Sequence, residues 1–165
     1  AVKAAKAAKV AAAKVAAAEE QDWTALAEVI GSDVAAELRD GTTTELDLTG
    51  MEIGDAGVAV LAKVLPECAA LTKLDLEKNE ISDAGVATLA QVLPQCAALQ
   101  KLYLSSNGIG DSGAVALSAV LPQCAALFRL TLQSNQIGSS VKSKLSNMHN
   151  TVRNTNGDTI WIRYK

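Results

Sequence analysis

Three cysteines and one histidine are the residue types here with the greatest potential for nucleophilic or metal chemistry. Cys68, Cys96 and Cys124 follow one another at intervals of 28 residues, and His149 is the only histidine. A thiolate beside an imidazole can act as a nucleophile–base pair, and both groups are zinc ligands. Cysteines spaced so regularly belong to separate structural units, so no zinc ligand set can form around His149. A Cys–His catalytic pair remains only a minor alternative.

Three aspartates recur with the same spacing, at Asp55, Asp83 and Asp111. Each stands where a helix is expected to start, and a carboxylate at that position favours the positive end of the helix. We therefore interpret them as helix-start residues rather than acid catalysts. No Gly-x-x-x-x-Gly-Lys-Ser/Thr motif for phosphate binding is present. The sequence predicts no catalytic, cofactor-binding or metal-ligating residue, and a protein that is not an enzyme.

The 28-residue spacing organises the whole middle of the chain. Four Leu-x-Leu triplets recur at this interval, starting at Leu46, Leu74, Leu102 and Leu130. The interval is also kept by Ile53, Ile81, Ile109 and Ile137, by Asn79, Asn107 and Asn135, by Gly57, Gly85 and Gly113, and by Pro66, Pro94 and Pro122. Self-similarity at a fixed period indicates a repeat architecture.

Each unit is predicted to contain a strand, a turn and a helix. The alternating leucines have the period of a strand with one buried face. The asparagine follows where the chain leaves the strand, and its amide can bond to backbone groups that the loop leaves open. A start such as "SDAG" then offers a helix cap, and a proline marks the helix end. One unit cannot bury both of its faces, so the units should stack into a solenoid with a parallel sheet inside and helices outside.

This pattern resembles the leucine-rich repeat, specifically the long subtype of ribonuclease-inhibitor-like proteins. The resemblance is carried by "LTKLDLEKNEISDAGVATLAQVL" from Leu71 and "LQKLYLSSNGIGDSGAVALSAVL" from Leu99, and it covers about residues 44–140. It implies an α/β solenoid in the form of a short right-handed horseshoe. It also implies a protein that binds protein partners on its concave, strand-bearing face.

Two recurrent sets of side chains are predicted to be structural. Asn79, Asn107 and Asn135 should form a ladder of amides through the stack. Cys68, Cys96 and Cys124 should be free, buried thiols, because packed helices lie about 9–10 Å apart whereas a disulfide needs Cα atoms within about 7 Å.

The segments that flank the repeats carry much of the positive charge. Residues 1–18 have four lysines and no acid, residues 19–140 have six basic and 17 acidic residues, and residues 141–165 have five basic and one acidic. Residues 1–20 are expected to form a long Ala/Lys helix that acts as an arm. Its lysines, candidates for partner binding, are Lys3, Lys6, Lys9 and Lys14. The alternative is a solvated, frayed extension.

The two ends of the repeat array should be closed by capping segments. Residues 21–43 should form two short helices, capped at Asp22 and Ser32, that cover the first repeat with Trp23. Their apolar faces should be formed by Trp23, Leu26, Val29 and Ile30 and by Val34 and Leu38. Residues 141–165 should add a capping helix and an edge strand. After Asn135 the next triplet is due at residues 158–160, but Ile160-Trp161-Ile162 comes two positions late. Met51, where an asparagine is due, marks the first copy as degenerate.

Residues beside the strand leucines should point out of the concave face in three columns. The columns are Glu45, Lys73, Lys101 and Arg129; Asp47, Asp75, Tyr103 and Thr131; and Thr49, Glu77, Ser105 and Gln133. The candidate partner-binding residues are Lys73, Asp75, Glu77, Lys101, Tyr103, Arg129, Thr131 and Gln133. The alternative is a self-paired, solvated surface on which Lys73 is neutralised by its acidic neighbours.

These observations favour a non-catalytic interaction or scaffold protein. We expect a structural subunit of a larger assembly, docked by its N-terminal helix and basic C-terminal end. The alternatives are a regulator that binds a partner on the concave face, for example a GTPase-activating type, or binding of the Lys-rich helix to an anionic surface. Four lysines without aromatic residues are a weak nucleic-acid signal, and no nucleic acid is expected. Three cysteines and no glycosylation sequon indicate an intracellular, reducing compartment. No apolar run approaches the length of a membrane span.

Overall fold

The structure, a computed structural model, describes residues 18–148 and 160–163. The arm lysines Lys3, Lys6, Lys9 and Lys14, and also His149, lie outside the described residues. Five strands form one parallel sheet in the order β1-β2-β3-β4-β5. The strands are β1 (Glu45–Asp47), β2 (Lys73–Asp75), β3 (Lys101–Tyr103), β4 (Arg129–Thr131) and β5 (Trp161–Arg163).

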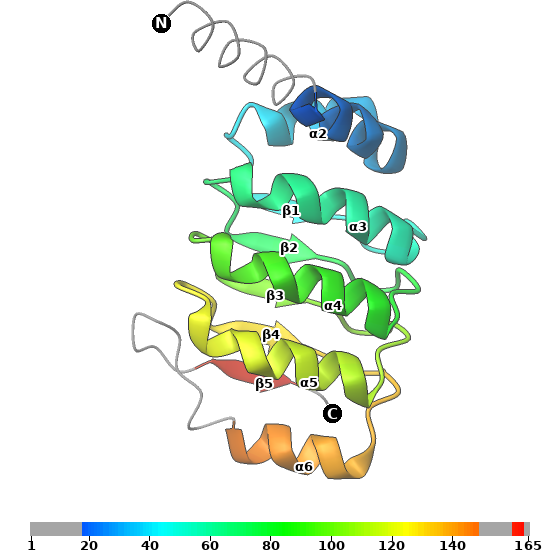
Figure 1. Ribbon diagram of the computed structural model, residues 1–165, viewed down its shortest axis with the longest axis vertical. Helices are drawn as coiled ribbons and strands as arrows, with labels where there is room; N and C mark the ends of the chain where they lie inside the picture. Colours follow the sequence, from blue (N-terminus) through cyan, green and yellow to red (C-terminus); the bar gives the residue numbers. More distant parts are fainter. Residues whose placement is uncertain (1–17, 149–159, 164–165) are drawn as a thin grey trace, which may run out of the picture.

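The helices form a second layer along one face of this sheet (Figure 1). Helical residues 18–30 come first in the described chain. The helices that follow are α2 (Ser32–Arg39), α3 (Gly54–Val64), α4 (Asp83–Val92), α5 (Asp111–Val120) and α6 (Ser139–Met148). Strand and helix alternate from β1 to α6, and α3, α4 and α5 pack against one another in chain order. This is the α/β solenoid that the repeat pattern predicts, with helices covering its N-terminal end.

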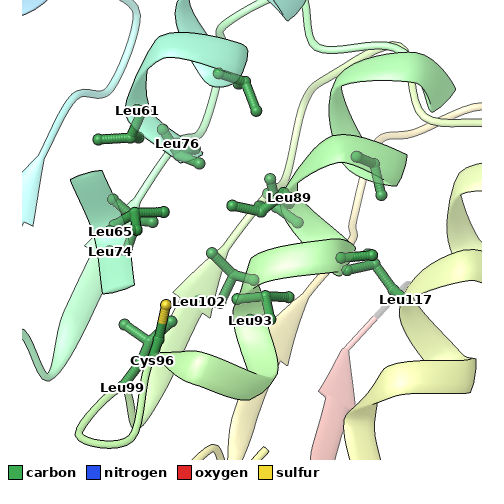
Figure 2. Close-up of a cluster of buried hydrophobic side chains, with 14 of the residues drawn as sticks. Leu61, Leu65, Leu74, Leu76, Leu89, Leu93, Cys96, Leu99, Leu102 and Leu117 are labelled. Atoms are coloured by element: carbon green, nitrogen blue, oxygen red, sulfur yellow. The ribbon is translucent and has the colours of Figure 1, made fainter. Parts of the chain in front are cut away.

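A row of apolar side chains crosses the sheet from edge to edge. Leu46, Leu74, Leu102, Leu130 and Ile162 pair in register across the five strands, and all are at most 3% exposed. Leucines from the helices meet this row between the two layers, among them Leu61, Leu89 and Leu117 (Figure 2). Each fully buried leucine contributes about 1.5–3 kcal/mol. The core is therefore continuous across repeats, and no repeat encloses a core of its own.

The helix of each central repeat ends in a tighter turn that contains the recurrent proline. The turns are η1 (Leu65–Glu67), η2 (Leu93–Gln95) and η3 (Leu121–Gln123), which follow α3, α4 and α5 directly. A proline lacks the N–H that would continue the α-helical hydrogen bonds, so the chain leaves the helix near Pro66, Pro94 and Pro122. The predicted position of the helix ends is confirmed.

The fifth, edge strand predicted at Ile160-Trp161-Ile162 is present as β5, Trp161–Arg163. Ile162, the last residue of the predicted triplet, lies opposite Leu130 in the sheet. The connection is therefore four residues longer than in the other repeats. A shift of two residues keeps the same side chains on the buried face of a strand. Ile160 and Ile162 accordingly remain buried, while Trp161 is 57% exposed.

The last helix keeps the spacing of the repeats. α6 begins at Ser139, 28 residues after the start of α5 at Asp111, so the boundary expected between residues 140 and 141 falls inside it. The backbone N–H of Gly138, just before α6, donates to Asp111 Oδ1 at 2.6 Å. The same kind of contact precedes α4 and α5, as described below.

The two helix caps expected near the N-terminus are wrong in detail. Residues 18–30 are one continuous helix through Asp22, which lies inside it and forms an ion pair with Lys63 at 2.7 Å. This helix also crosses the boundary placed after residue 20. Gly31, at φ 91°, precedes α2, so Ser32 is the first helical residue and not the cap.

The N-terminal helices bury Trp23 against the first repeat, as expected. Trp23 is 7% exposed, and its Nε1–H donates to Glu67 Oε2 at 3.2 Å. The second and third repeats have Gln95 and Gln123 where the first has Glu67. Leu38 is buried on α2, but Val34 is 36% exposed because it lies away from the repeat, contrary to the face predicted for it.

Candidate functional site

The asparagine ladder holds the loops that follow the strands. Asn107 Oδ1 accepts from the backbone N–H groups of Asn79 (2.9 Å) and Ile81 (3.0 Å), in the preceding repeat. Its Nδ2 donates to the carbonyls of Leu76 and Leu104. Asn79 and Asn135 donate to the corresponding carbonyls, those of Leu48 and Leu104. These amides are occupied by backbone, so they are not groups that could act on a bound nucleotide.

The ladder accompanies an unusual backbone conformation just before each asparagine. Lys78, Ser106 and Ser134 have φ between 54° and 57°, and Gly50 has φ 68° at the same position of the first repeat. L-residues rarely adopt this left-handed conformation. The sequence pattern gave no sign of it, since three of the four residues are not glycine.

A second ladder, which the sequence did not predict, runs along the helix starts. Asp83 Oδ1 accepts from the backbone N–H groups of Gly110 (2.6 Å) and Gly113 (2.9 Å) in the next repeat. Asp55 likewise accepts from the backbone N–H (2.8 Å) and hydroxyl (2.5 Å) of Ser82. Each aspartate therefore caps the following helix rather than stabilising only its own, because the stack brings the next helix start beside it.

This ladder explains two of the three recurrent glycines, Gly85 and Gly113. A Cβ added at Gly85 would lie 2.3 Å from Asp55 Oδ1, and one at Gly113 would lie 2.6 Å from Asp83 Oδ1. Only a glycine lets the carboxylate approach the helix start so closely. The shared spacing of aspartate and glycine was the available signal for this contact.

The three cysteines are buried and unpaired, each just after a 3-10 turn. Their thiols donate to the carbonyls four residues earlier, Val64 (3.3 Å), Val92 (3.5 Å) and Val120 (3.5 Å). Burial raises the pKa of Cys68 to about 11, and the charge of Glu67 adds to this effect. Burial also raises the pKa of Cys96 to about 12 and that of Cys124 to about 11.

Thiol labelling of the native protein at pH 8 is expected to be slow. Only the thiolate reacts, and a pKa near 11 leaves about 100-fold less thiolate at pH 8 than an ordinary cysteine has. Labelling with a chromogenic disulfide reagent should therefore be at least about 100-fold slower than in denaturant, and should accelerate as the pH rises. Labelling of one or more native thiols at the denatured rate would contradict their burial.

The open face of the sheet brings the predicted columns together. Glu45, Lys73, Lys101 and Arg129 lie side by side in register, as do Asp47, Asp75, Tyr103 and Thr131. Both columns continue onto β5, where Trp161 pairs with Arg129 and Arg163 pairs with Thr131. Trp161 and Arg163 were not among the surface candidates predicted from the sequence, although the alternation of Ile160, Trp161 and Ile162 places both on the open face in either register. We call residues of these columns the concave surface.

The part of the concave surface over β1 and β2 is acidic. Burial raises the pKa of Asp75, and the nearby charge of Glu77 adds to it, although the Glu77 backbone N–H donates to Asp75 Oδ1 at 3.2 Å. Hydrogen bonds from Thr49 lower the pKa of Asp47. Lys73 Nζ lies 3.7 Å from a carboxylate oxygen of Glu45. This half of the surface pairs partly with itself.

The part over β3, β4 and β5 is basic and aromatic, and it is hollowed. A hollow of about 380 Å³ is lined by Tyr103, Arg129, Thr131, Trp161, Ile162 and Arg163. Lys73 reaches its border, with Nζ 5.6 Å from the centre of the Tyr103 ring. Thr131 is buried, and its hydroxyl accepts from Ser105 Oγ at 2.9 Å and lies 3.4 Å from Glu77 Oε1. Gln133 is half-buried and does not line the hollow.

The side chains around the hollow are of types that are common in protein interfaces. Arginine, tryptophan and tyrosine are the residue types most often found at the energetic centre of protein interfaces.

Among residues 18–145 and 160–163, no group of three or more His, Cys, Asp or Glu side chains is placed to hold a metal ion. Within the described part of the chain, no helix is long and apolar enough to cross a membrane.

Comparison with known proteins agrees with this architecture. Residues 44–62, 67–90 and 95–118 match the family described as "Leucine Rich repeat". The chain is similar to a solved structure titled "Leiomodin-1 Actin-Binding Site 2 (ABS2)", with a TM-score of 0.69 and 17% identity over 82% of this chain and 79% of that chain. No curated protein sequence matches the chain.

The three matched segments coincide with the repeats seen in the fold. Each covers a strand, its loop and most of the helix that follows, from β1 to α5. The match is to the repeat in general, so the ribonuclease-inhibitor-like subtype stays a prediction. The repeat spacing, the stacked parallel strands and this match together lead to one conclusion: the chain is a leucine-rich repeat protein.

Proposed function

We propose that this is a non-catalytic protein-interaction protein that binds a protein partner on the concave surface. The observation that carries the proposal is the hollow over β3 to β5, which places Tyr103 and Trp161 beside two arginines. A partner side chain that enters the hollow would lose contact with water, and contacts of this kind dominate binding energy. The other described face of the sheet is covered by helices (Figure 1), so the strands offer only this face to a partner.

The similarity to the leiomodin structure supports the fold and names a first partner to test. Its title refers to an actin-binding site, but at 17% identity the similarity does not transfer that partner to this chain. Purified actin is therefore one probe for the concave surface, and a positive result would need to depend on the residues of the hollow.

Docking into a larger assembly through the arm and the basic C-terminal end is the second use that we propose. It rests on the four lysines and no acid of residues 1–18. Deleting residues 1–17 would test it while keeping Glu20, which forms an ion pair with Arg39. If the capture of partners, or binding to acidic vesicles, is lost on this deletion but kept in concave-surface variants, that result would support docking by the arm.

The remaining alternative is stimulation of a small GTPase. A panel of such enzymes would test it.

Arg129→Glu should weaken partner binding, and this experiment tests the proposed function. Partners are captured with the full chain, identified by quantitative mass spectrometry, and then measured as purified proteins. We expect at least about a tenfold loss of affinity, because a reversed charge at the hollow opposes the partner. Lys144→Glu is the matched control, since Lys144 is exposed on α6 and the change in charge is the same. Equal binding by both variants would exclude the hollow as the contact.

A further inference from the structure

We propose that the hollow selects an acidic segment of the partner, in which carboxylates flank a large apolar side chain. This inference rests on the proposed function and specifies the chemistry of the partner. It depends on two arginines that have no carboxylate within 4 Å in the described part of the chain, on the apolar lining between them, and on the acidic residues of β1 and β2.

The two arginines are available for ion pairing. Arg129 and Arg163 are exposed, and within the described part of the chain neither guanidinium lies within 4 Å of a carboxylate. The ion pairs of this part join other residues, Arg39 with Glu20, Lys63 with Asp22 and Lys73 with Glu45. A guanidinium binds a carboxylate through two parallel hydrogen bonds, which makes it specific for such groups.

The two arginines are also spaced for a peptide. Arg163 pairs with Thr131, two residues along β4 from Arg129, so the arginines are diagonal neighbours on one face. The strand rise and the strand spacing put their Cα atoms roughly 8 Å apart. Side chains two residues apart on an extended peptide are separated by about 7 Å. Two carboxylates of one short segment can therefore reach both guanidinium groups.

The space between the arginines favours an apolar side chain. Tyr103 and Trp161 line it, whereas the side chain of Ile162 lies in the core row on the other face of the sheet. A volume of about 380 Å³ is enough for one large side chain. The partner segment should therefore combine carboxylates with an aromatic or aliphatic residue, rather than being uniformly acidic.

The rest of the concave surface argues against an extended polyanion. Asp47 and Asp75 lie in the same column as Tyr103, on β1 and β2, the two strands that precede β3 in the sheet. A nucleic acid crossing the sheet would bring its phosphates against these carboxylates, whereas a short acidic segment can stay over β4 and β5. A flat anionic membrane would not enter a hollow. These acids would also prevent an acidic segment from sliding along the sheet.

Selection from a random peptide library on phage tests the inference without a known partner. The full chain serves as bait, and Arg129→Ala/Arg163→Ala serves for counter-selection. We expect the enriched peptides to contain two or more acidic residues and a large apolar one. A synthetic peptide of that sequence should bind the double variant about tenfold or more weakly, and should bind Lys144→Ala as it binds the unaltered chain. Circular dichroism would check that both variants remain folded.

The outcomes separate this inference from the proposed function. The enriched peptides could instead be neutral or basic, with binding weakened by Asp75→Lys but not by loss of the arginines. That result would overturn the inference and leave the concave surface as the binding site. Arginine-dependent binding of a single-stranded oligonucleotide, without any acidic peptide, would overturn it in favour of a polyanion. If no peptide binds in a way that depends on the concave surface, the inference is overturned. Binding of actin or of a captured protein that requires Arg129 would still support the proposed function.

Discussion

Asn107→Ala should lower the free energy of unfolding by about 4 kcal/mol, a large share of the roughly 5–15 kcal/mol of a typical domain. The substitution removes the acceptor of the buried N–H groups of Asn79 and Ile81. It also removes the donor to the carbonyls of Leu76, Leu104 and Ser105. Each buried polar group left without a partner costs about 1–3 kcal/mol. Urea unfolding followed by circular dichroism at 222 nm would measure the change.

Two variants define the meaning of that result. Gln136→Ala changes an exposed amide in the following loop and should alter stability by no more than about 0.5 kcal/mol. Asn135→Ala removes the ladder residue of the fourth repeat, which is only half-buried, so its cost should be smaller than that of Asn107→Ala. A loss below about 1 kcal/mol for Asn107→Ala would show that water replaces the amide and that the ladder is not what holds the loops.

Gly85→Ala should destabilise the protein by about 2 kcal/mol, although alanine normally favours a helix over glycine by about 0.5–1 kcal/mol. The reversed sign has a steric cause, since the new methyl group would lie 2.3 Å from Asp55 Oδ1. The carboxylate must move, and it then loses its hydrogen bonds to Ser82. Thermal unfolding by calorimetry would measure the loss.

A double-mutant cycle with Asp55→Ala tests this cause. Without the carboxylate, Gly85→Ala should cost at least about 1 kcal/mol less than it does in the unaltered chain. Gln91→Ala, at an exposed site of α4, should be nearly neutral and serves as the control. Additive effects of the two substitutions would mean that Asp55 and Gly85 act separately, and the aspartate ladder would lose its explanation for the glycines.

The repeat spacing made most of the fold predictable, because each Leu-x-Leu triplet specifies both a strand and its buried face. The fifth strand was harder to place. Ile160 and Ile162 both satisfy the buried pattern, and only the pairing of Ile162 with Leu130 decides between them. The prediction of a helix cap at Asp22 was wrong for a related reason. Asp22 is a favourable cap residue locally, but the helix continues through it, and its carboxylate pairs with Lys63, 41 residues away.

The concave surface was predictable as columns but not as a shape. In-register stacking follows from the period alone, so Lys73, Lys101 and Arg129 were placed correctly as neighbours. The hollow also depends on Trp161 and Arg163, and the pairing of β5 with β4, which the period does not specify, decides which column each of them joins. The aspartate contacts were missed because local pattern describes a helix start, whereas the carboxylate acts on the next repeat.

The asparagine ladder has a direction, and this explains why the first repeat can carry Met51 in place of an asparagine. Each asparagine reaches back: its amide donates to the preceding repeat, as Asn79 does to Leu48. At position 51 no preceding repeat exists in the described chain, so an asparagine there would have no such carbonyl to bind, and the exposed Met51 loses nothing. The array could therefore lengthen by tandem duplication of an internal 28-residue unit without new contacts. Lengthening ahead of β1 would require an asparagine at position 51 first.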